Sequence, residues 1–158
     1  AGGAIVKDGG EKMEYDDSDL NRVIGRSIRQ LEQKRRQYMD SSLQGTGLHG
    51  PMYRCLLFLA RNPGSSQDQL AEHQHTDKAN IARIARKLED LGYIVRRQDE
   101  DNRRQYQIDL TDRGAALVPR IRQCLHAWNA ALVAGISVEE EEALIRLLRR
   151  MQDNTEAL

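Results

Sequence analysis

Two groups of basic residues have side chains of the kind that contact nucleic acid. Between Lys78 and Leu88 the sequence holds four basic residues and no acid, and a doubled arginine, Arg103–Arg104, follows shortly afterwards. Arginine donates paired hydrogen bonds to guanine edges or to phosphate, whereas short side chains let a backbone approach a groove. The alternative for each group is an ordinary solvated surface, because exposed helices and turns often carry charge. The surrounding elements have to decide between these interpretations.

The first basic group falls on a predicted helix that begins with a cap at Thr76 and stops at Gly92. One side of this helix is an apolar stripe with helical periodicity, formed by Ile81, Ile84, Ala85, Leu88 and Leu91. The opposite side carries small side chains near the start of the helix and basic side chains after them. We expect Arg83, Arg86 and Asn80 to contact base edges, and Thr76 and Lys78 to contact backbone phosphate. The candidate DNA-binding residues here are Thr76, Lys78, Ala79, Asn80, Arg83 and Arg86.

The second basic group falls at the tip of a predicted β-hairpin. After Gly92 the apolar period changes from 3.6 to 2, so that "YIVRR" and "QYQIDL" are predicted strands and "QDEDN" a turn. Arginine at such a tip, next to a positive helix, can reach the minor groove or its phosphates. We therefore add Arg103 and Arg104 to the candidate DNA-binding residues. Acids in the turn are unsuited to phosphate but suited to orienting arginine by ion pairing.

The remaining elements place both groups in one architecture. A helix is predicted over 18–43, ending at "QGTG"; a second opens at Gly50–Pro51; Ser66 and Gln69 form a capping box for a third. The second and third helices, the basic helix and the hairpin make residues 48–113 a winged helix-turn-helix pattern. Thr111 caps a long helix that contains Pro119, and Ser137 with Glu140 forms the capping box of the last one. The fold class is mainly α with a small β-hairpin.

Residues 18–43 and 112–155 carry apolar stripes that lie outside the winged unit. Examples are Val23, Ile24 and Ile28 in the first range and Leu144, Leu147 and Leu148 in the second. A monomer could pack these stripes internally, whereas a symmetric dimer would bury more of them. In a dimer, two recognition helices about 34 Å apart would match a pseudo-palindromic DNA site. We predict that these ranges form a helical dimerisation region.

Composition and motif searches exclude several other classes. Lys+Arg and Asp+Glu both number 24 among 158 residues, so the net charge is zero. The net charge therefore does not favour any class of binding partner. We find no phosphate-binding glycine loop and no nucleophile elbow, and His73 and His75 are poorly spaced for a metal. We therefore expect no enzymatic activity, no cofactor and no metal.

The location of the protein is expected to be the cytoplasm. No apolar run approaches the roughly 18 residues of a membrane span, no secretory signal pattern is present, and no membrane partner is predicted. Cys55 and Cys124 fall in apolar helical patterns without metal-ligand spacing, which favours buried thiols in a reducing compartment. The alternative is an oxidant sensor that uses one of them. The glycine-rich residues 1–15 are predicted to be disordered.

Together these residues resemble a known family. The segment "SSQDQLAEHQHTDKANIARIARKLEDLGYIVRRQDEDNRRQYQIDLTDRG", residues 65–114, is similar to the DNA-binding core of MarR-type (multiple antibiotic resistance regulator) transcription factors. The similar pieces are "LAE", "KLEDLGYI" and the arginine-bearing hairpin that leads into "LTDRG". With the flanking helices, the resemblance covers about residues 18 to 155.

The resemblance implies a transcriptional regulator that binds a pseudo-palindromic operator as an obligate homodimer. It places the wing arginine of the family at Arg104, with Asp101 and Asn102 as the candidates for bracing it. The family usually has Asp two residues before this arginine, where this chain has Asn102. Family members commonly respond to small phenolic or anionic effectors, and others sense oxidants through a cysteine early in the first helix, where this chain has none. A winged-helix protein-interaction module without DNA binding is the other hypothesis.

Overall fold

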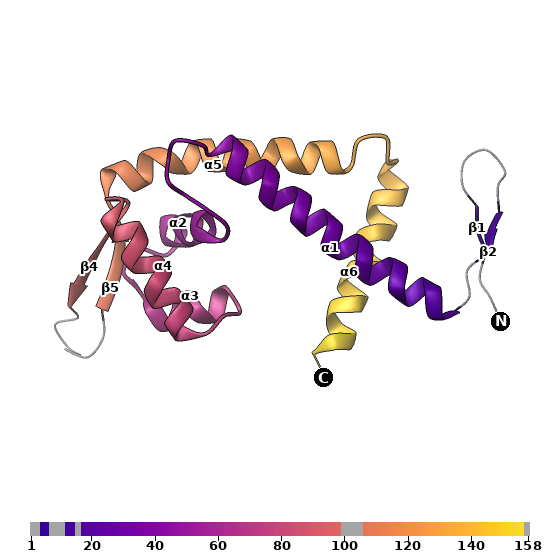
Figure 1. Cartoon of the computed structure of the whole chain (residues 1–158), viewed down its shortest axis with the longest axis horizontal. Helices are drawn as coiled ribbons and strands as arrows, with labels where there is room; N and C mark the ends of the chain where they lie inside the picture. Colours follow the sequence, from indigo (N-terminus) through magenta and orange to yellow (C-terminus); the bar gives the residue numbers. More distant parts are fainter. Residues whose placement is uncertain (1–3, 7–11, 15–16, 99–105, 157–158) are drawn as a thin grey trace.

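The computed structural model describes residues 4–6, 12–14, 17–98 and 106–156. A lobe of three helices and a small sheet lies at one side, and three longer helices extend away from it (Figure 1). The helices of the lobe are α2 (Met52–Arg61), α3 (Gln67–His73) and α4 (Lys78–Asp90). The predicted class, mainly α with a winged helix-turn-helix, is confirmed.

The sheet of this lobe has three antiparallel strands in the order β3-β5-β4. Strands β4 (Ile94–Gln98) and β5 (Tyr106–Leu110) are the predicted hairpin, with Arg96 opposite Ile108. Strand β3 (Ser65–Ser66) pairs with β5 and was not predicted, because two serines before a helix give no strand pattern. Tyr106 lies beyond the core and is 46% exposed, unlike Ile108 on the same face, which is fully buried.

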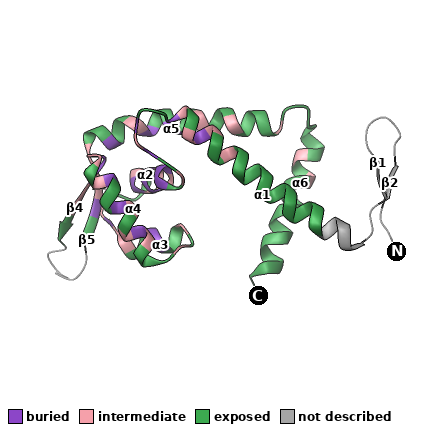
Figure 2. Cartoon of the chain, viewed as in Figure 1, coloured by how far each residue is buried: buried purple, intermediate pink, exposed green. Residues whose placement is uncertain are grey.

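The core of the lobe is formed mainly by aliphatic residues from α2, α3, α4, β4 and β5, with further residues from the long helices such as Met39 and Ile121 (Figure 2). The most deeply buried are Leu56, Leu59, Leu70, Ile81, Leu88 and Ile108. Tyr93 is also buried in this core, and its hydroxyl donates a hydrogen bond to the Thr46 carbonyl at 2.8 Å. The stripe predicted for the basic helix is confirmed, with Ile81, Ala85 and Leu88 buried and Ile84 and Leu91 packed against the core.

The three longer helices are α1 (Asp17–Ser42), α5 (Asp112–Leu132) and α6 (Val138–Thr155). Helix α1 packs against α5, where the rings of Tyr38 and Trp128 lie 5.7 Å apart. Helix α5 also contacts α2 and thereby connects the lobe to the rest of the chain. In contrast, α6 has no buried residue in this chain, and it appears exposed over most of its length in Figure 2.

Most predicted helix starts are confirmed, with two corrections. The capping boxes of Ser66 with Gln69 and of Ser137 with Glu140 are both present, and Thr111 caps α5 through the Gly114 N–H. Helix α4, however, is capped by Asp77 rather than Thr76, because the carboxylate next to the first helical residue reaches the Asn80 N–H at 2.7 Å. Pro51 is likewise the cap position of α2 and not its first helical residue.

Of residues 1–15, for which disorder stays a prediction, the structure describes 4–6 and 12–14. Strands β1 (Ala4–Val6) and β2 (Lys12–Glu14) pair antiparallel, with Ile5 opposite Met13. Ile5 and Val6 of the first strand have β-branched side chains, which favour strands. Two paired strands are at best marginally stable alone in water.

Candidate nucleic-acid interface

Helix α4 presents its basic face because its opposite stripe is fixed in the core. Ile81 and Leu88 are at most 1% exposed, whereas Ala79, Arg83, Arg86 and Lys87 are exposed. Since side chains three or four positions apart share one side of a helix, burial of the stripe turns the arginines outward. The small Ala79 lies near the start of this face, where a DNA backbone or base edge could approach closely.

The start of α4 holds Arg83 through two consecutive side-chain hydrogen bonds. Asn80 Nδ2 donates to Thr76 Oγ1 at 2.9 Å, and Arg83 donates to Asn80 Oδ1 at 2.7 Å. The arrangement orients the Arg83 guanidinium before any ligand arrives and leaves most of its five N–H donors for other acceptors. The Thr76 hydroxyl accepts in this chain, so its own hydrogen remains available for a phosphate.

Lys78, predicted to contact phosphate, has an acidic partner on the preceding helix. Its Nζ lies 2.8 Å from Asp68 Oδ2, with both side chains more than half exposed. Exposed ion pairs of this kind contribute little to stability, so exchange of the carboxylate for a phosphate costs little. The contact joins residues of α4 and α3, and the sequence patterns did not indicate it.

Helix α4 is joined to the wing by a pair that the sequence analysis missed. Arg96 Nε on β4 donates to Glu89 Oε2 at 2.8 Å, and the terminal nitrogen of Arg96 contacts the same oxygen. This hydrogen bond lowers the pKa of Glu89 and raises that of Arg96. The Arg96 guanidinium also lies 5.9 Å from the centre of the Tyr106 ring on β5. The only sequence signal was an arginine on the apolar side of a predicted strand.

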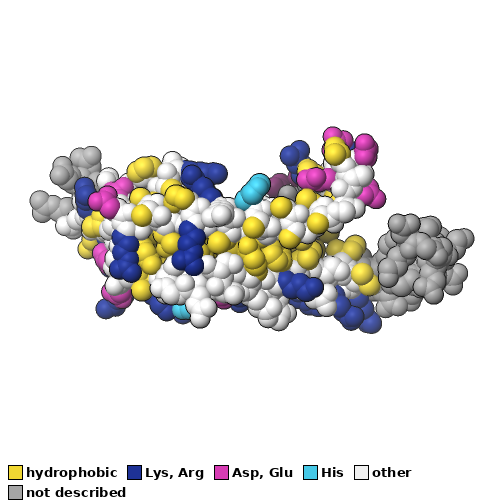
Figure 3. Space-filling model, turned by 90° about the horizontal axis from the view of Figure 1, so that it is seen from above, with side chains coloured by type: hydrophobic (Ala, Val, Ile, Leu, Met, Phe, Trp, Pro, Cys, Tyr) yellow, Lys and Arg dark blue, Asp and Glu magenta, His cyan; other side chains and the backbone are white. Residues whose placement is uncertain are grey.

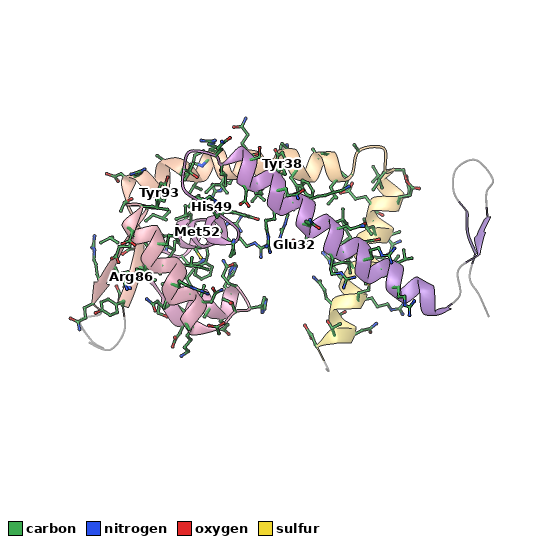
Figure 4. The ribbon with its side chains drawn as sticks, in the orientation of Figure 1. Glu32, Tyr38, His49, Met52, Arg86 and Tyr93 are labelled. Atoms are coloured by element: carbon green, nitrogen blue, oxygen red, sulfur yellow. The ribbon has the colours of Figure 1, made fainter. Side chains whose placement is uncertain are left out.

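The basic face and the wing meet at an open hollow. Its lining residues are Ala82, Arg83, Arg86, Glu89, Asp90 and Arg96. Figure 4 shows Arg86 beside the β4–β5 hairpin, at the left of the view. The structure therefore brings the predicted Arg83 and Arg86 together with the base of the predicted wing.

The predicted tip of the wing lies outside the described residues. This holds for Asp101, Asn102, Arg103 and Arg104, so their roles stay predictions. The two strands that lead to the tip are described, and their last pair is Gln98 opposite Tyr106.

The two cysteines differ in exposure. Cys55 is 1% exposed, as expected, and burial raises the pKa of its thiol to about 12. Cys124 is only partly buried, which corrects the expectation that both are buried. The two differ because Cys55 lies within the core of the lobe on α2, whereas Cys124 on α5 packs against the edge of that core.

We expect a thiol reagent such as Ellman's reagent to label Cys124 and to leave Cys55 unreacted in the native protein at pH 8. At this pH about one Cys55 thiol in ten thousand is ionised, and only the thiolate attacks. Native and urea-unfolded samples of the wild type and of Cys124→Ser provide the comparison. Rapid labelling of native Cys124→Ser would mean that Cys55 is reactive. This result would contradict the expectation and support Cys55 as an oxidant sensor.

Among the described residues, no group of three or more His, Cys, Asp and Glu side chains is placed to hold a metal ion. His73 instead packs its ring 4.4 Å from that of Phe58. Within the same part of the chain, no helix has the length and apolar character needed to cross a bilayer.

These elements define a winged helix-turn-helix protein: a buried helix-turn-helix, an outward basic helix, and a hairpin at its end. The comparisons identify the family. A family model described as the MarR family matches residues 46–105. A protein of Bacillus subtilis named the uncharacterized HTH-type transcriptional regulator YybA is 31% identical over 140 residues, which cover 88% of this chain and 90% of that protein. The chain belongs to the MarR family.

Two further similarities extend over most of the chain. The HTH-type transcriptional repressor Rv2887 of Mycobacterium tuberculosis is 29% identical over 116 residues, or 73% of this chain and 84% of the relative. A crystal structure of MarR superposes with a TM-score of 0.73 at 30% identity, covering 85% of this chain and 98% of that one. The resemblance read from the sequence is confirmed.

Proposed function

We propose that this protein is a sequence-specific DNA-binding regulator, a ligand-responsive repressor that binds a pseudo-palindromic operator as a homodimer. The observation that carries the proposal is the exposed face of α4, where Arg83 is oriented by Asn80 and adjoins Arg86. A preoriented arginine loses less side-chain freedom when it binds a base edge or a phosphate. The names of the relatives, transcriptional regulator and repressor, support the same activity.

The dimer is proposed from apolar side chains that this chain does not cover. They lie on α1, α5, α6 and the α5–α6 loop: Val23, Ile24, Ile28, Leu31, Leu132, Ile136, Val138, Leu144, Ile145, Leu147, Leu148 and Met151. Figure 3 shows hydrophobic side chains in a band across the face seen from above. Extended apolar patches mark interaction sites, and a second copy supplies an equally apolar surface.

The proposed mode of binding follows from these two surfaces. Helix α4 of each protomer enters a major groove, where Arg83, Arg86 and Asn80 contact base edges and Thr76 and Lys78 contact phosphate. Arg104, with Arg103, reaches the adjacent minor groove, and Asp101 or Asn102 braces the wing. Two-fold symmetry of the dimer then selects two half-sites one helical turn apart. A small-molecule effector would act by changing the separation of the two α4 helices. The protein is proposed to act in the cytoplasm, in keeping with its proposed binding to DNA.

We expect Arg83→Ala and Arg104→Ala each to weaken binding to the operator by about 1–3 kcal/mol, because each removes a cationic donor from one groove in both half-sites. The operator is first selected from a random duplex pool, and affinity is then measured by gel shift at several salt concentrations. Arg122→Ala, which removes an exposed arginine from α5, serves as the matched control.

The outcomes separate the two hypotheses. Counterion release predicts that wild-type affinity falls steeply with salt and that the variants show a smaller slope. Unchanged affinity of Arg83→Ala would remove its role in base contact. If no duplex is bound even at low salt, a winged-helix protein-interaction module becomes the better description.

A further inference from the structure

Three charged residues, two from α4 and one from the wing, form a cluster beside the proposed DNA-binding face. Arg86 and Glu89 are three positions apart on α4, so they are neighbours on the helix surface. Glu89 bonds to Arg96 on β4, and all three residues line the same hollow. One carboxylate therefore lies between two arginines, of which only one, Arg96, is hydrogen bonded to it.

We propose that Arg96 is a positioning residue: by occupying Glu89, it keeps this carboxylate from pairing with Arg86 and leaves Arg86 free for DNA. The proposal rests on the proposed function, since it assigns a role at the same DNA-binding face. It concerns a residue that touches the helix and the wing but is not itself among the proposed base contacts.

The geometry favours Arg96 as the partner of Glu89. Arg96 approaches with two nitrogens, and both side chains are about one-third exposed or less, at 27% and 33%. Its guanidinium has a second contact with the Tyr106 ring, which reduces its freedom to leave. Arg86, in contrast, is exposed and lies one helical turn away. A partly buried pair held at several points outcompetes an exposed neighbour for the same oxygen.

The position of Arg96 on its strand explains how it reaches across. Arg96 pairs with Ile108, on the face that buries Ile94 and Ile108 against the lobe. The next residue of β4 on this face is Gln98, which pairs with Tyr106. At that pair the sheet extends past the core, so Arg96 lies at the boundary of the core. At this boundary a long side chain can bury its stem and direct its charge to α4.

Loss of Arg96 leaves Glu89 with Arg86 as its adjacent cation. Pairing of these two residues would withdraw Arg86 from the groove and leave a carboxylate beside the phosphates. The first effect removes an attractive contact, and the second adds repulsion. Removing the Glu89 charge as well abolishes both effects. If Arg96 has this role, removing the charge of Glu89 should therefore restore the operator affinity that the loss of Arg96 reduces.

The experiment compares operator affinity in Arg96→Met, Glu89→Gln and the double variant. Methionine retains an apolar stem over Tyr106 and removes only the guanidinium. We expect Arg96→Met to weaken binding roughly tenfold, and the double variant to regain most of this loss. Arg97→Met is the matched control, because Arg97 is the adjacent exposed arginine on the other face of β4. Adding Glu89→Gln to Arg97→Met should produce no comparable recovery.

A measurement on the free protein separates this inference from the proposed function. The ¹⁵N–¹H signal of Arg86 Nε is expected to shift in Arg96→Met, as Arg86 pairs with Glu89, and to return in the double variant. Wild-type binding with an unchanged Arg96→Met affinity, or a double variant as weak as Arg96→Met, overturns the inference alone. If the wild type binds no duplex, the proposed function is overturned. If the Arg86 signal is also unshifted in Arg96→Met, the pairing of Arg86 with Glu89 is rejected as well.

Discussion

Leu147→Glu is expected to convert the protein from a dimer to a monomer and to abolish tight operator binding. Leu147 is 57% exposed on α6, within a stripe that contains Leu144, Leu148 and Met151. Burial of one such leucine contributes about 1.5 kcal/mol or more, and a symmetric dimer contains it twice. Its loss should therefore raise the dimer dissociation constant by at least about 100-fold, before any cost of burying the carboxylate.

Light scattering coupled to gel filtration, at several protein concentrations, measures this change. The matched control is Arg149→Glu, which introduces the same helix-favouring residue on the other side of α6. The control should remain dimeric. A monomer–dimer equilibrium that is unaffected by Leu147→Glu would place the partner surface elsewhere and refute the proposed dimer.

Gly114→Ala is expected to destabilise the protein by about 3 kcal/mol or more, at the upper end of the range for overpacking. A Cβ at this position would lie 2.1 Å from the Tyr93 carbonyl oxygen, and backbone atoms cannot give way as a flexible side chain can. That oxygen also accepts the Thr111 N–H at 3.0 Å, while the Thr111 hydroxyl donates to the Gly92 carbonyl at 2.6 Å. The substitution must therefore separate the wing from the start of α5.

Urea unfolding followed by circular dichroism measures this loss. Gly25→Ala is the matched control, because Gly25 lies in α1 with nothing within 4 Å of an added Cβ. In the interior of a helix this substitution should be neutral or stabilise by up to about 1 kcal/mol. Equal stabilities of Gly114→Ala and wild type would mean that the junction between β4 and α5 can open without cost.

The difference between these two glycines illustrates the limit of sequence reasoning here. Both stand in predicted helices, and neither residue type nor local pattern indicates which one faces a neighbouring backbone. Pairing of Glu89 with Arg96 was missed for a related reason. The two residues come from elements of different periodicity, and only the packing of the strand on the helix brings their charged groups together.

Periodicity and capping did predict the elements themselves. The stripe of α4, the capping boxes at Ser66 and Ser137, and the change of period after Gly92 are local signals, set by residues a few positions apart. The cap at Thr76 was misassigned because two adjacent residues can both accept a hydrogen bond, and only the backbone geometry selects Asp77.

The sequence by itself determined the winged helix-turn-helix, the family and the outward arginines of α4, because each depends on spacing along one segment. The tertiary structure decided which of these arginines are held and by what. It occupied Glu89 with Arg96, joined Lys78 to Asp68, and left the apolar side chains of α6 exposed. These features depend on distances between residues of separate elements, and such distances are fixed only when the elements pack together.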